Sequence, residues 1–416
     1  MRAPSSLTLT FLPLLGAAAL ASCTGAKSTA AAKTADSLTV TVRNRLAQAR
    51  PAETVSIPAA GRLQALLAQY GAENLLVRDE QTGQFVVSQP LDTDGNGTPD
   101  ELLFQVASEA GGTRSFTVMG QPDGAARQPK SELTTFSRFV PERTDDYAWE
   151  NDLVSFRTYG PEAERMVVAK EKGGTLTSGM DCWLKRVSYP VIDKWYGGYR
   201  TNSNYYHVDR GEGHDPYHVG VSRGFAGTGV WENDSLYVSR NFISYKRLAT
   251  GPIRTLFELS YAPWSANGRT VREKKIISLD LGSNLTRFEE QLSADKPLPN
   301  LTIGTTLHAE PKGVRGEVKA EPKQGWFRYW EPMDDAQLGT GIVLAPAAIQ
   351  GWQDHRTRAK EQSHLLVMTT PANGRLVYYA GFGWTKSGQF ATPAAWDDYL
   401  RDFAQRLAYP LEVEVK

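Results

Sequence analysis

Cysteine is nearly absent, because the 416-residue chain contains only Cys23 and Cys182. Cys23 falls at the end of an N-terminal leader, where we expect it to carry a lipid, so Cys182 has no partner for an internal disulfide. Cys182 stands beside Trp183 in an apolar context. This context favours a buried structural thiol over a reactive nucleophile, which an accessible and electropositive environment would activate.

An excess of charge of either sign is also absent, since 46 lysines and arginines balance 46 aspartates and glutamates. A chain with this balance lacks the basic surface by which proteins bind nucleic acid. After residue 22, no apolar run approaches the roughly 20 residues that a membrane-spanning helix requires. The two absences predict a soluble body that binds no nucleic acid and does not cross a membrane.

The first 22 residues have the three parts of a secretory signal peptide. Arg2 gives the positive start, an apolar stretch runs from Leu7 to Leu20, and two small residues follow. The sequence Leu-Ala-Ser-Cys that ends at Cys23 matches the lipobox of bacterial lipoproteins. We therefore expect residues 1–22 to be removed and Cys23 to be lipidated. An ordinary signal peptide with a chance cysteine is the alternative.

A tether follows the leader. Residues 23–36 are small, polar and weakly charged, and a stretch of this composition buries too little apolar surface to fold. The lipid on Cys23 is then the only membrane contact, because its acyl chains bury CH₂ groups at roughly 0.8 kcal/mol each. No acidic run follows Cys23, which favours a lipid anchor in the bacterial envelope that faces the periplasm.

Turn-forming and aromatic residues are abundant, with 37 Gly, 23 Pro, 10 Trp and 17 Tyr. This usage is typical of β-rich proteins. Short alternating segments separated by Gly, Asp and Pro predict a small β-sandwich domain over residues 37–122. A polar linker is expected over 123–136, and longer strands with aromatic loops predict a large β-sandwich domain over 137–416. The predicted fold class is therefore all-β.

Two helices interrupt this pattern. Residues 61–70 predict a short helix that Gly71 ends. A C-terminal helix is predicted from Thr392 to Leu407, with Thr392 as N-cap and Pro393 at the first helical position. Its apolar residues recur at helical spacing and form one stripe, which favours packing against the body over ligand binding.

Oxygen ligands recur at alternate positions of a glycine-rich turn in the segment DTDGNGTPDE, residues 92–101. Hard cations such as Ca²⁺ prefer this arrangement. An EF-hand requires a glutamate at the twelfth position, where this chain has Leu103, so the turn resembles the calcium turns of extracellular repeat proteins instead. A metal-free Asp/Asn/Gly turn is the alternative. The predicted ligands of a structural Ca²⁺ are Asp92, Asp94, Asn96 and Asp100.

Three of the six histidines, His207, His214 and His218, fall within twelve residues. Tyrosines, acids and arginines are interleaved with them, and glycines and Pro216 predict loops, which often carry functional residues. Metal binding is one use of such a cluster, although the spacing matches no zinc motif. A purely structural alternative is that the histidines hydrogen-bond a long ordered loop.

Proton abstraction is the second use of this cluster. A Tyr/His pair can remove the proton α to a uronate carboxylate while a cation neutralises the carboxylate, as in many polysaccharide lyases. We assign His207 as the base and Tyr206 as the acid, and Arg210, Arg223 or His214 would bind the carboxylate. The predicted catalytic residues are therefore His207, Tyr206, His214 and Arg210.

Hydrolysis of a glycosidic bond by two carboxylates is the third use. The sequence offers several carboxylates but does not pair them: Glu150, Asp152, Glu212, Asp215 and Glu331. Aromatic side chains flank polar loop residues and would give flat faces for sugar rings, with about half of them expected in the core instead. The predicted substrate-binding residues are Trp149, Arg223, His218, Trp231 and Trp330.

Several of these stretches together resemble a known family. They include QPLDTDGNGTPDELLFQ, ERTDDYAWENDLVSFRTYGP, SGMDCWLKRVSYPVIDKWY and YHVDRGEGHDPYHVG, within residues 37–290. The chain resembles the secreted bacterial family named domain of unknown function 4861, whose members are often encoded in glycan-utilisation loci. The resemblance implies a β-sandwich and a glycan context, and it carries over no established catalytic residue. The later strands are also similar to the galactose-mutarotase-like sandwich of lyases.

These observations predict a carbohydrate-active enzyme for uronate-containing oligosaccharides, in first place a lyase that works by β-elimination. A non-catalytic glycan-binding lipoprotein, a glycoside hydrolase and a sugar epimerase are the alternatives. The expected fold is a small N-terminal β-sandwich followed by a large galactose-mutarotase-like β-sandwich with one C-terminal helix. The expected partners are an oligosaccharide and, through the lipid on Cys23 alone, a membrane.

Overall fold

A computed structural model describes residues 37–122, 124–125, 128–176, 179–219, 224–308, 315–359 and 362–416. They belong to one compact unit that runs from Ser37 to Lys416. The predicted signal peptide, the lipidation site Cys23, the tether and Arg223 lie outside the described residues. In the part of the chain that the structure describes, no helix is both long enough and apolar enough to cross a membrane.

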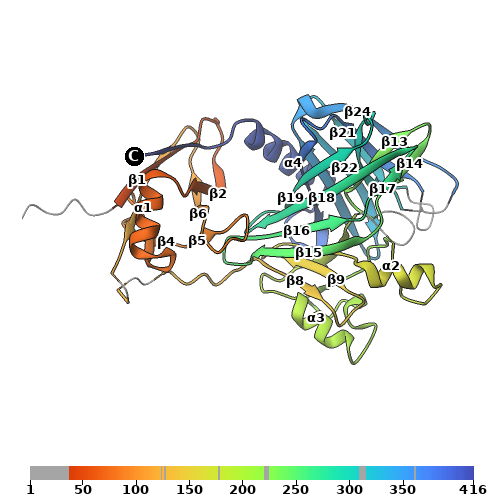
Figure 1. The fold of residues 1–416 in the computed structure, drawn as a ribbon, viewed down its shortest axis with the longest axis horizontal. Helices are drawn as coiled ribbons and strands as arrows, with labels where there is room; N and C mark the ends of the chain where they lie inside the picture. The colour runs from red at the N-terminus through yellow and green to blue at the C-terminus, as the bar shows by residue number, and fades with distance from the viewer. Residues whose placement is uncertain are drawn as a thin grey trace, which may run out of the picture. The chain divides into compact units, whose positions relative to one another are not determined.

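The N-terminal part of the unit forms two small antiparallel sheets (Figure 1). Its elements are β1 (Ser37–Arg43), β2 (Arg50–Pro58), α1 (Gly61–Tyr70), the 3-10 helix η1 (Ala72–Asn74), β3 (Leu75–Asp79), β4 (Phe85–Val86), β5 (Ser88–Leu91), β6 (Glu101–Ser108) and β7 (Thr113–Gly120). Alternation in β1 sends Leu38, Val40 and Val42 into a common core and leaves Thr39 exposed. The predicted helix over 61–70 is confirmed.

The first sheet also contains the last strand of the chain. Strand β27 (Glu412–Val415) pairs antiparallel with β1, which gives the order β27-β1-β7-β3-β4, while the second sheet has the order β2-β6-β5. Residues 412–415 therefore belong to this sheet and not to the large sandwich predicted for them. The structure does not divide residues 37–416 into smaller units. The domain boundaries at 122 and 136 therefore stay a prediction.

Three further sheets make up the rest of the fold. The first has the order β12-β11-β10-β9-β8, with β8 (Phe136–Val140), β9 (Asp146–Glu150), β10 (Ser155–Thr158), β11 (Asp181–Lys185) and β12 (Gly213–His214). The second has the order β14-β13-β20-β25-β24, with β13 (Gly227–Glu232), β14 (Ser235–Val238), β20 (Leu301–Thr306), β24 (Ile349–His355) and β25 (His364–Thr369).

The third sheet has nine strands and is the centre of the fold. Its order is β15-β16-β18-β19-β26-β23-β22-β21, and β17 adds to β18. Its strands are β15 (Phe242–Ala249), β16 (Arg254–Tyr261), β17 (Trp264–Ala266), β18 (Arg269–Asp280), β19 (Leu285–Ala294), β21 (Glu317–Glu321), β22 (Trp326–Met333), β23 (Ala336–Leu344) and β26 (Arg375–Trp384).

One buried apolar cluster contains side chains from all three of these sheets. Tyr147 and Trp149 of β9 have ring centroids 4.3 and 5.3 Å from that of Phe257 on β16, and Ile303 of β20 belongs to the same cluster. Burial of this apolar surface is the main stabilising contribution to the fold. Cys182 is also fully buried here, and burial raises the pKa of its thiol, as expected for a structural cysteine.

The opposite face of the nine-stranded sheet is partly covered by the C-terminal helix α4 (Pro393–Ala408) (Figure 1). The hydroxyl of Thr392 accepts a hydrogen bond from the Ala395 amide at 3.2 Å, so the predicted N-cap is confirmed. Trp396 and Leu400 pack onto the sheet. Gly341 of β23 makes room for the helix, since a Cβ there would lie 2.5 Å from Leu400.

Two short helices are not evident in the sequence pattern. They are α2 (Pro161–Val168) and α3 (Ile192–Tyr199), and eight residues give little more than two turns of periodicity. Glu150 holds the start of α3, because its carboxylate accepts from the amides of Val191 and Ile192 and pairs with Lys185 at 2.9 Å. Further 3-10 turns are η4 (Pro346–Ala348) and η5 (Thr385–Ser387). The all-β class with one C-terminal helix is confirmed.

Candidate functional site

The structure gives each of the three predicted histidines a different partner, so the single histidine cluster expected from the sequence is wrong. His207 ends the 3-10 helix η2 (Tyr205–His207), His214 ends β12, and His218 lies in the segment that follows. The side chain of His214 bonds Asp334, whereas that of Asp215, the next residue, bonds Arg157.

His207 keeps an accessible ring, with 41% of its side chain exposed. Its Nδ1 lies 3.1 Å from the backbone oxygen of Asp215. Because a carbonyl oxygen only accepts, Nδ1 carries the proton and the lone pair of the neutral ring is on Nε2. Partial burial, together with the positive charge of Arg157, lowers the pKa of His207. His207 is therefore neutral at pH 7, the form in which imidazole acts as a general base.

Tyr206 is not placed to act as the acid, so the role predicted for it is wrong. Only 1% of the residue is exposed, and its hydroxyl accepts a hydrogen bond from Nη1 of Arg157 at 3.2 Å. Its ring packs against Trp183 and Tyr196, with centroids 4.9 and 5.9 Å away. Burial raises the pKa of Tyr206 as well. Tyr206 is therefore the residue of η2 that contacts the buried guanidinium of Arg157.

That cation belongs to an ion cluster that lies beneath η2. Arg157 of β10 donates through Nε to Asp181 of β11 at 3.0 Å and through Nη2 to Asp215 at 2.7 Å, and all three side chains are buried. Burial and the neighbouring Asp181 raise the pKa of Asp215. The sequence holds a signal for this cluster, because Arg157 and Asp181 are charged residues inside short apolar strands. Its effect is to fix Asp215, whose carbonyl orients His207.

Arg210 folds back onto the turn that carries His207. Its Nε donates to the backbone oxygen of Tyr205 at 3.3 Å, and its guanidinium lies 5.0 Å from the centroid of the Tyr205 ring. The side chain remains exposed. Arg210 is thus the predicted cation that the structure brings to the same turn as the base, and most of its five N–H donors stay available for an anion.

His214 lies in a separate environment. It is 6% exposed, its Nε2 lies 2.9 Å from Oδ2 of Asp334, and its ring centroid is 5.8 Å from that of Trp384. Among the described residues, its buried Nδ1 has no hydrogen-bond partner. These contacts connect β12 to the turn after β22, and they do not place His214 beside His207 as a second carboxylate-binding group.

His218 contributes its backbone to a third group. The carbonyl of His218 faces Nε2 of His308 at 2.8 Å, and Nδ1 of His308 lies 2.9 Å from both carboxylate oxygens of Glu331. Both nitrogens of His308 face acceptors, so a doubly protonated ring satisfies both contacts. Glu331 is buried. The pair ties the His218 segment to β22, and His308 is a residue that the sequence cluster of histidines did not include.

The carboxylates considered for hydrolysis are each engaged in a local network. Each is held by its own donors: Glu150 by Lys185, Asp152 by the Gly282 amide, Glu212 by Lys194, Asp215 by Arg157 and Glu331 by His308. These bonds give each carboxylate a structural role. The hydrolase alternative therefore gains no support from this set.

The predicted sugar-binding tryptophans are mostly core residues. Trp149 is fully buried and donates to the Thr286 hydroxyl at 3.0 Å, and Trp330 is buried in the cluster beneath α4. Both assignments as substrate-binding residues are wrong. Their neighbours in sequence are polar because alternate residues of β9 and β22 face different layers. Trp231 on β13 is partly exposed, with its ring centroid 4.9 Å from that of His355.

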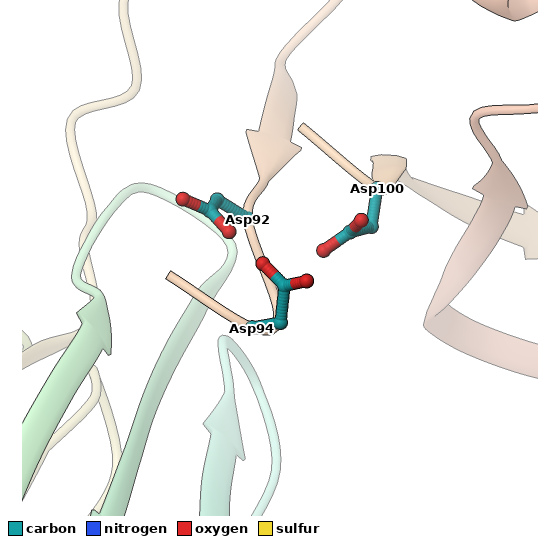
Figure 2. A group of neighbouring side chains, drawn as sticks. All are labelled: Asp92, Asp94 and Asp100. Atoms are coloured by element: carbon teal, nitrogen blue, oxygen red, sulfur yellow. The ribbon is translucent and has the colours of Figure 1, made fainter. Parts of the chain in front are cut away.

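The glycine-rich turn at 92–100 brings its carboxylates together. Figure 2 shows Asp92, Asp94 and Asp100 directed towards one space, and one oxygen of each lies within 4.8 Å of the others. Asp92 also accepts hydrogen bonds from the amides of Gly95 and Gly97 at 2.6 and 2.7 Å. Asn96 is engaged within the turn. Its side-chain amide donates to the carboxylate of Asp94, and its side-chain carbonyl accepts from the backbone amide of Thr98. The arrangement suits both a calcium turn and a metal-free turn.

Comparison with known proteins identifies the family of the chain. Residues 42–413 match the family model described as domain of unknown function (DUF4861). The chain belongs to the DUF4861 family. This DUF4861 protein is 42% identical over 378 residues to a protein named uncharacterized protein P7 from Formosa agariphila, an alignment that covers 91% of this chain and 93% of that protein.

Two solved structures resemble the DUF4861 protein more distantly. One is a glycosyl hydrolase family 38 protein from Enterococcus faecalis, with a TM-score of 0.49 and 11% identity over 92% of this chain and 47% of that one. The other is an alpha-mannosidase from Enterococcus faecalis V583, with a TM-score of 0.40 and 10% identity over 92% of this chain and 46% of that one. The DUF4861 chain spans about half of their length, and likenesses this distant carry no argument about activity.

The variant Tyr206→Phe tests the structural role of Tyr206. It removes the acceptor for Arg157 and keeps the ring, so we expect the free energy of unfolding to fall by about 1–2 kcal/mol. Turnover of any glycan that the protein cleaves should stay within about twofold, because the hydroxyl does not reach the surface. Urea unfolding and kcat measure the two effects, with the exposed Tyr409→Phe as control. A loss of kcat of about hundredfold with unchanged stability would restore the acid role.

Calcium addition distinguishes the two interpretations of the turn. We expect Ca²⁺ to raise the Tm of the purified protein, because a ligand that binds only the folded state stabilises it. The variant Asp94→Asn should abolish this rise, and Asp234→Asn, in an exposed hairpin turn, should preserve it. An identical Tm with Ca²⁺ and with a chelator would identify the metal-free turn.

Proposed function

We propose that this DUF4861 protein is a carbohydrate-active enzyme that cleaves uronate-containing oligosaccharides by β-elimination. The observation that supports this proposal is the state of His207, a neutral and accessible imidazole whose Nδ1 is held by Asp215 and whose lone pair is on Nε2. A base in this form is what removal of a proton α to a carboxylate requires.

The reaction balances with His207 as both base and acid. Nε2 takes the proton from the carbon α to the uronate carboxylate, and the electron pair of that C–H bond forms a carbon–carbon double bond. The bond between the β carbon and the glycosidic oxygen breaks at the same time. The imidazolium then returns the proton to the leaving oxygen, so that no second acid is required in place of Tyr206.

Positive charge near η2 supports the proposed transition state. The exposed guanidinium of Arg210 would bind the substrate carboxylate in a bidentate manner, which lowers the energy of the enolate-like charge. Arg157 and Arg143 also lower the pKa of His207, after the larger effect of burial and against the opposing effect of Asp181.

Product formation decides between this proposal and its alternatives. The purified protein is incubated with polygalacturonate, rhamnogalacturonan and ulvan, and elimination is expected to give products with the ultraviolet absorbance of an unsaturated uronate. New reducing ends without that absorbance would indicate a hydrolase, and an altered sugar configuration without cleavage would indicate an epimerase. Binding with unchanged ligand, seen by sugar NMR, would indicate a non-catalytic glycan-binding protein.

The base assignment makes a quantitative prediction. The variant His207→Ala should lower kcat by about 100- to 10,000-fold, because it removes general base catalysis. Since His207 acts as the neutral form and its pKa is lowered, kcat/KM should fall as the pH drops, with a midpoint below 6.5. The control is Val208→Ala, next to the base and exposed. Full activity of His207→Ala would remove His207 from the mechanism.

We also propose that a lipid on Cys23 holds the protein at the bacterial envelope, facing the periplasm. The lipobox and the polar stretch over 23–36 support this proposal. The variant Cys23→Ser should move the protein from the membrane fraction to the soluble fraction of cells, because it removes the acyl chains. Retention of the variant in the membrane fraction would contradict the lipid anchor.

A further inference from the structure

A cavity of about 440 Å³ lies on the face of the nine-stranded sheet that α4 partly covers. Its floor is formed by β16, β18, β19 and β26, and its sides are formed by α4, β2 and the segment before β27. Cavities of this size, set between separate structural layers, are typical small-molecule sites. None of the residues of η2 or β12 lines it, so the cavity is separate from His207.

Bonds across the cavity hold its walls in place. Arg406 of α4 pairs with Glu53 of β2, with 2.7 Å between Nε and Oε1. Gln105 of β6 donates to the backbone oxygen of Leu281 at 2.9 Å. Because these bonds join the parts of the chain that form the walls, a ligand would enter a site that is already formed, which reduces the entropic cost of binding.

Aromatic rings form one wall. The ring centroid of Phe403 lies 5.0 Å from that of Tyr379 and 6.2 Å from that of Tyr399, and Tyr399 stacks on Trp396 at 5.1 Å with an interplanar angle of 8°. All three lining rings are partly exposed. Rigid rings supported from behind give apolar faces of the kind on which a pyranose ring can pack.

Positive charge is in excess among the residues that line the cavity. The lining contains Arg254, Arg287 and Arg406 against the carboxylates of Asp280 and Glu53. Asp280 holds Arg254 through two hydrogen bonds of 2.6 and 2.7 Å, and Glu53 holds Arg406. The remaining cation is therefore Arg287.

The carboxylate next to Arg287 does not neutralise it fully. Glu289 accepts from Arg287 at 3.0 Å and also from Arg375 at 2.5 Å. Two guanidinium groups thus share one carboxylate, and only Arg287 of the two lines the cavity. A ligand with an anionic group would complete this charge balance, and its bond to a guanidinium would be of the strong, charge-assisted kind.

We propose that this cavity binds an acidic saccharide, with its carboxylate or sulfate on Arg287 and the apolar face of its ring against Phe403. A neutral apolar ligand would bury Arg287 with only the carboxylate that it shares with Arg375 as counter-charge, which is costly. The inference rests on the proposed function only in taking a glycan as the ligand. It assigns no step of the elimination to the cavity.

Direct binding tests the proposal. Calorimetric titration of the full chain with oligogalacturonate, with sulfated ulvan oligosaccharides and with neutral galacto-oligosaccharides compares a carboxylate, a sulfate and an uncharged sugar. At least one acidic oligosaccharide should bind more tightly than the neutral one, by about tenfold or more. Equal affinity for acidic and neutral sugars, or no binding of either acidic set, would overturn the proposal.

Two variants locate the site. Arg287→Met should weaken binding of the acidic oligosaccharide by about tenfold or more, because a charge-assisted hydrogen bond is lost while Glu289 keeps Arg375. The matched control is Arg375→Met, which removes the other cation on Glu289 and lies outside the cavity. Phe403→Leu keeps apolar volume and removes the ring face, so it should weaken both acidic and neutral binding. Wild-type affinity of Arg287→Met would overturn the proposal.

The variant His207→Ala separates this inference from the proposed elimination. It should retain the full affinity of the cavity while product formation is lost. Binding that depends on Arg287, in a wild-type protein that forms no product, would support the cavity and contradict the elimination. If the wild-type protein cleaves the substrate and Arg287→Met changes neither affinity nor rate, the result would support the elimination and contradict binding in the cavity. Loss of binding in His207→Ala would place the ligand at η2 and overturn the cavity assignment.

Discussion

The buried guanidinium of Arg157 is the constraint on which the region around η2 depends. A charge of this kind is costly to bury unless anions and hydrogen-bond acceptors surround it. Asp181, Asp215 and Tyr206 supply them from three separate segments of the chain. Each segment is therefore fixed relative to β10, although η2 and β12 contain few residues of regular structure. The orientation of His207 follows from this arrangement, because the backbone of Asp215 accepts from its ring.

The nine-stranded sheet gives the molecule two different faces. On one face, the large aromatic side chains of β9 and β10 meet those of β16 and β26 in a buried core. On the other face, α4 covers only part of the sheet, and Arg254 of β16 and Arg287 of β19 line the uncovered part. Because side chains of successive residues point to opposite faces, one set of strands serves both as core and as the floor of a polar cavity.

Elements with a clear period were predictable from the sequence, and the arrangement of the site was only partly predictable. The alternation of β1, the helix over 61–70 and the cap at Thr392 all follow from local rules. The acid role predicted for Tyr206 was wrong because nothing in a single sequence shows that an aromatic residue of a loop turns inward to a buried cation. The prediction of one histidine cluster was wrong for a related reason, since His214 at the end of β12 bonds Asp334 while the next residue, Asp215, bonds Arg157. The walls of the cavity come from β2, four strands of the sheet and α4, so no local pattern unites them.

The pairing of β27 with β1 has a consequence for the connectivity of the fold. Lys416 and Thr39 exchange two backbone hydrogen bonds of 2.9 Å, so the two ends of the compact unit lie in neighbouring strands of one ladder. A short peptide from Lys416 to Ser37 would close the backbone into a ring without disturbing any sheet. New ends opened at the exposed hairpin turn of Asn233 and Asp234 would then give a circular permutant with the same strand pairing. The fold is defined by which strands are neighbours, and the point at which translation starts is separable from it.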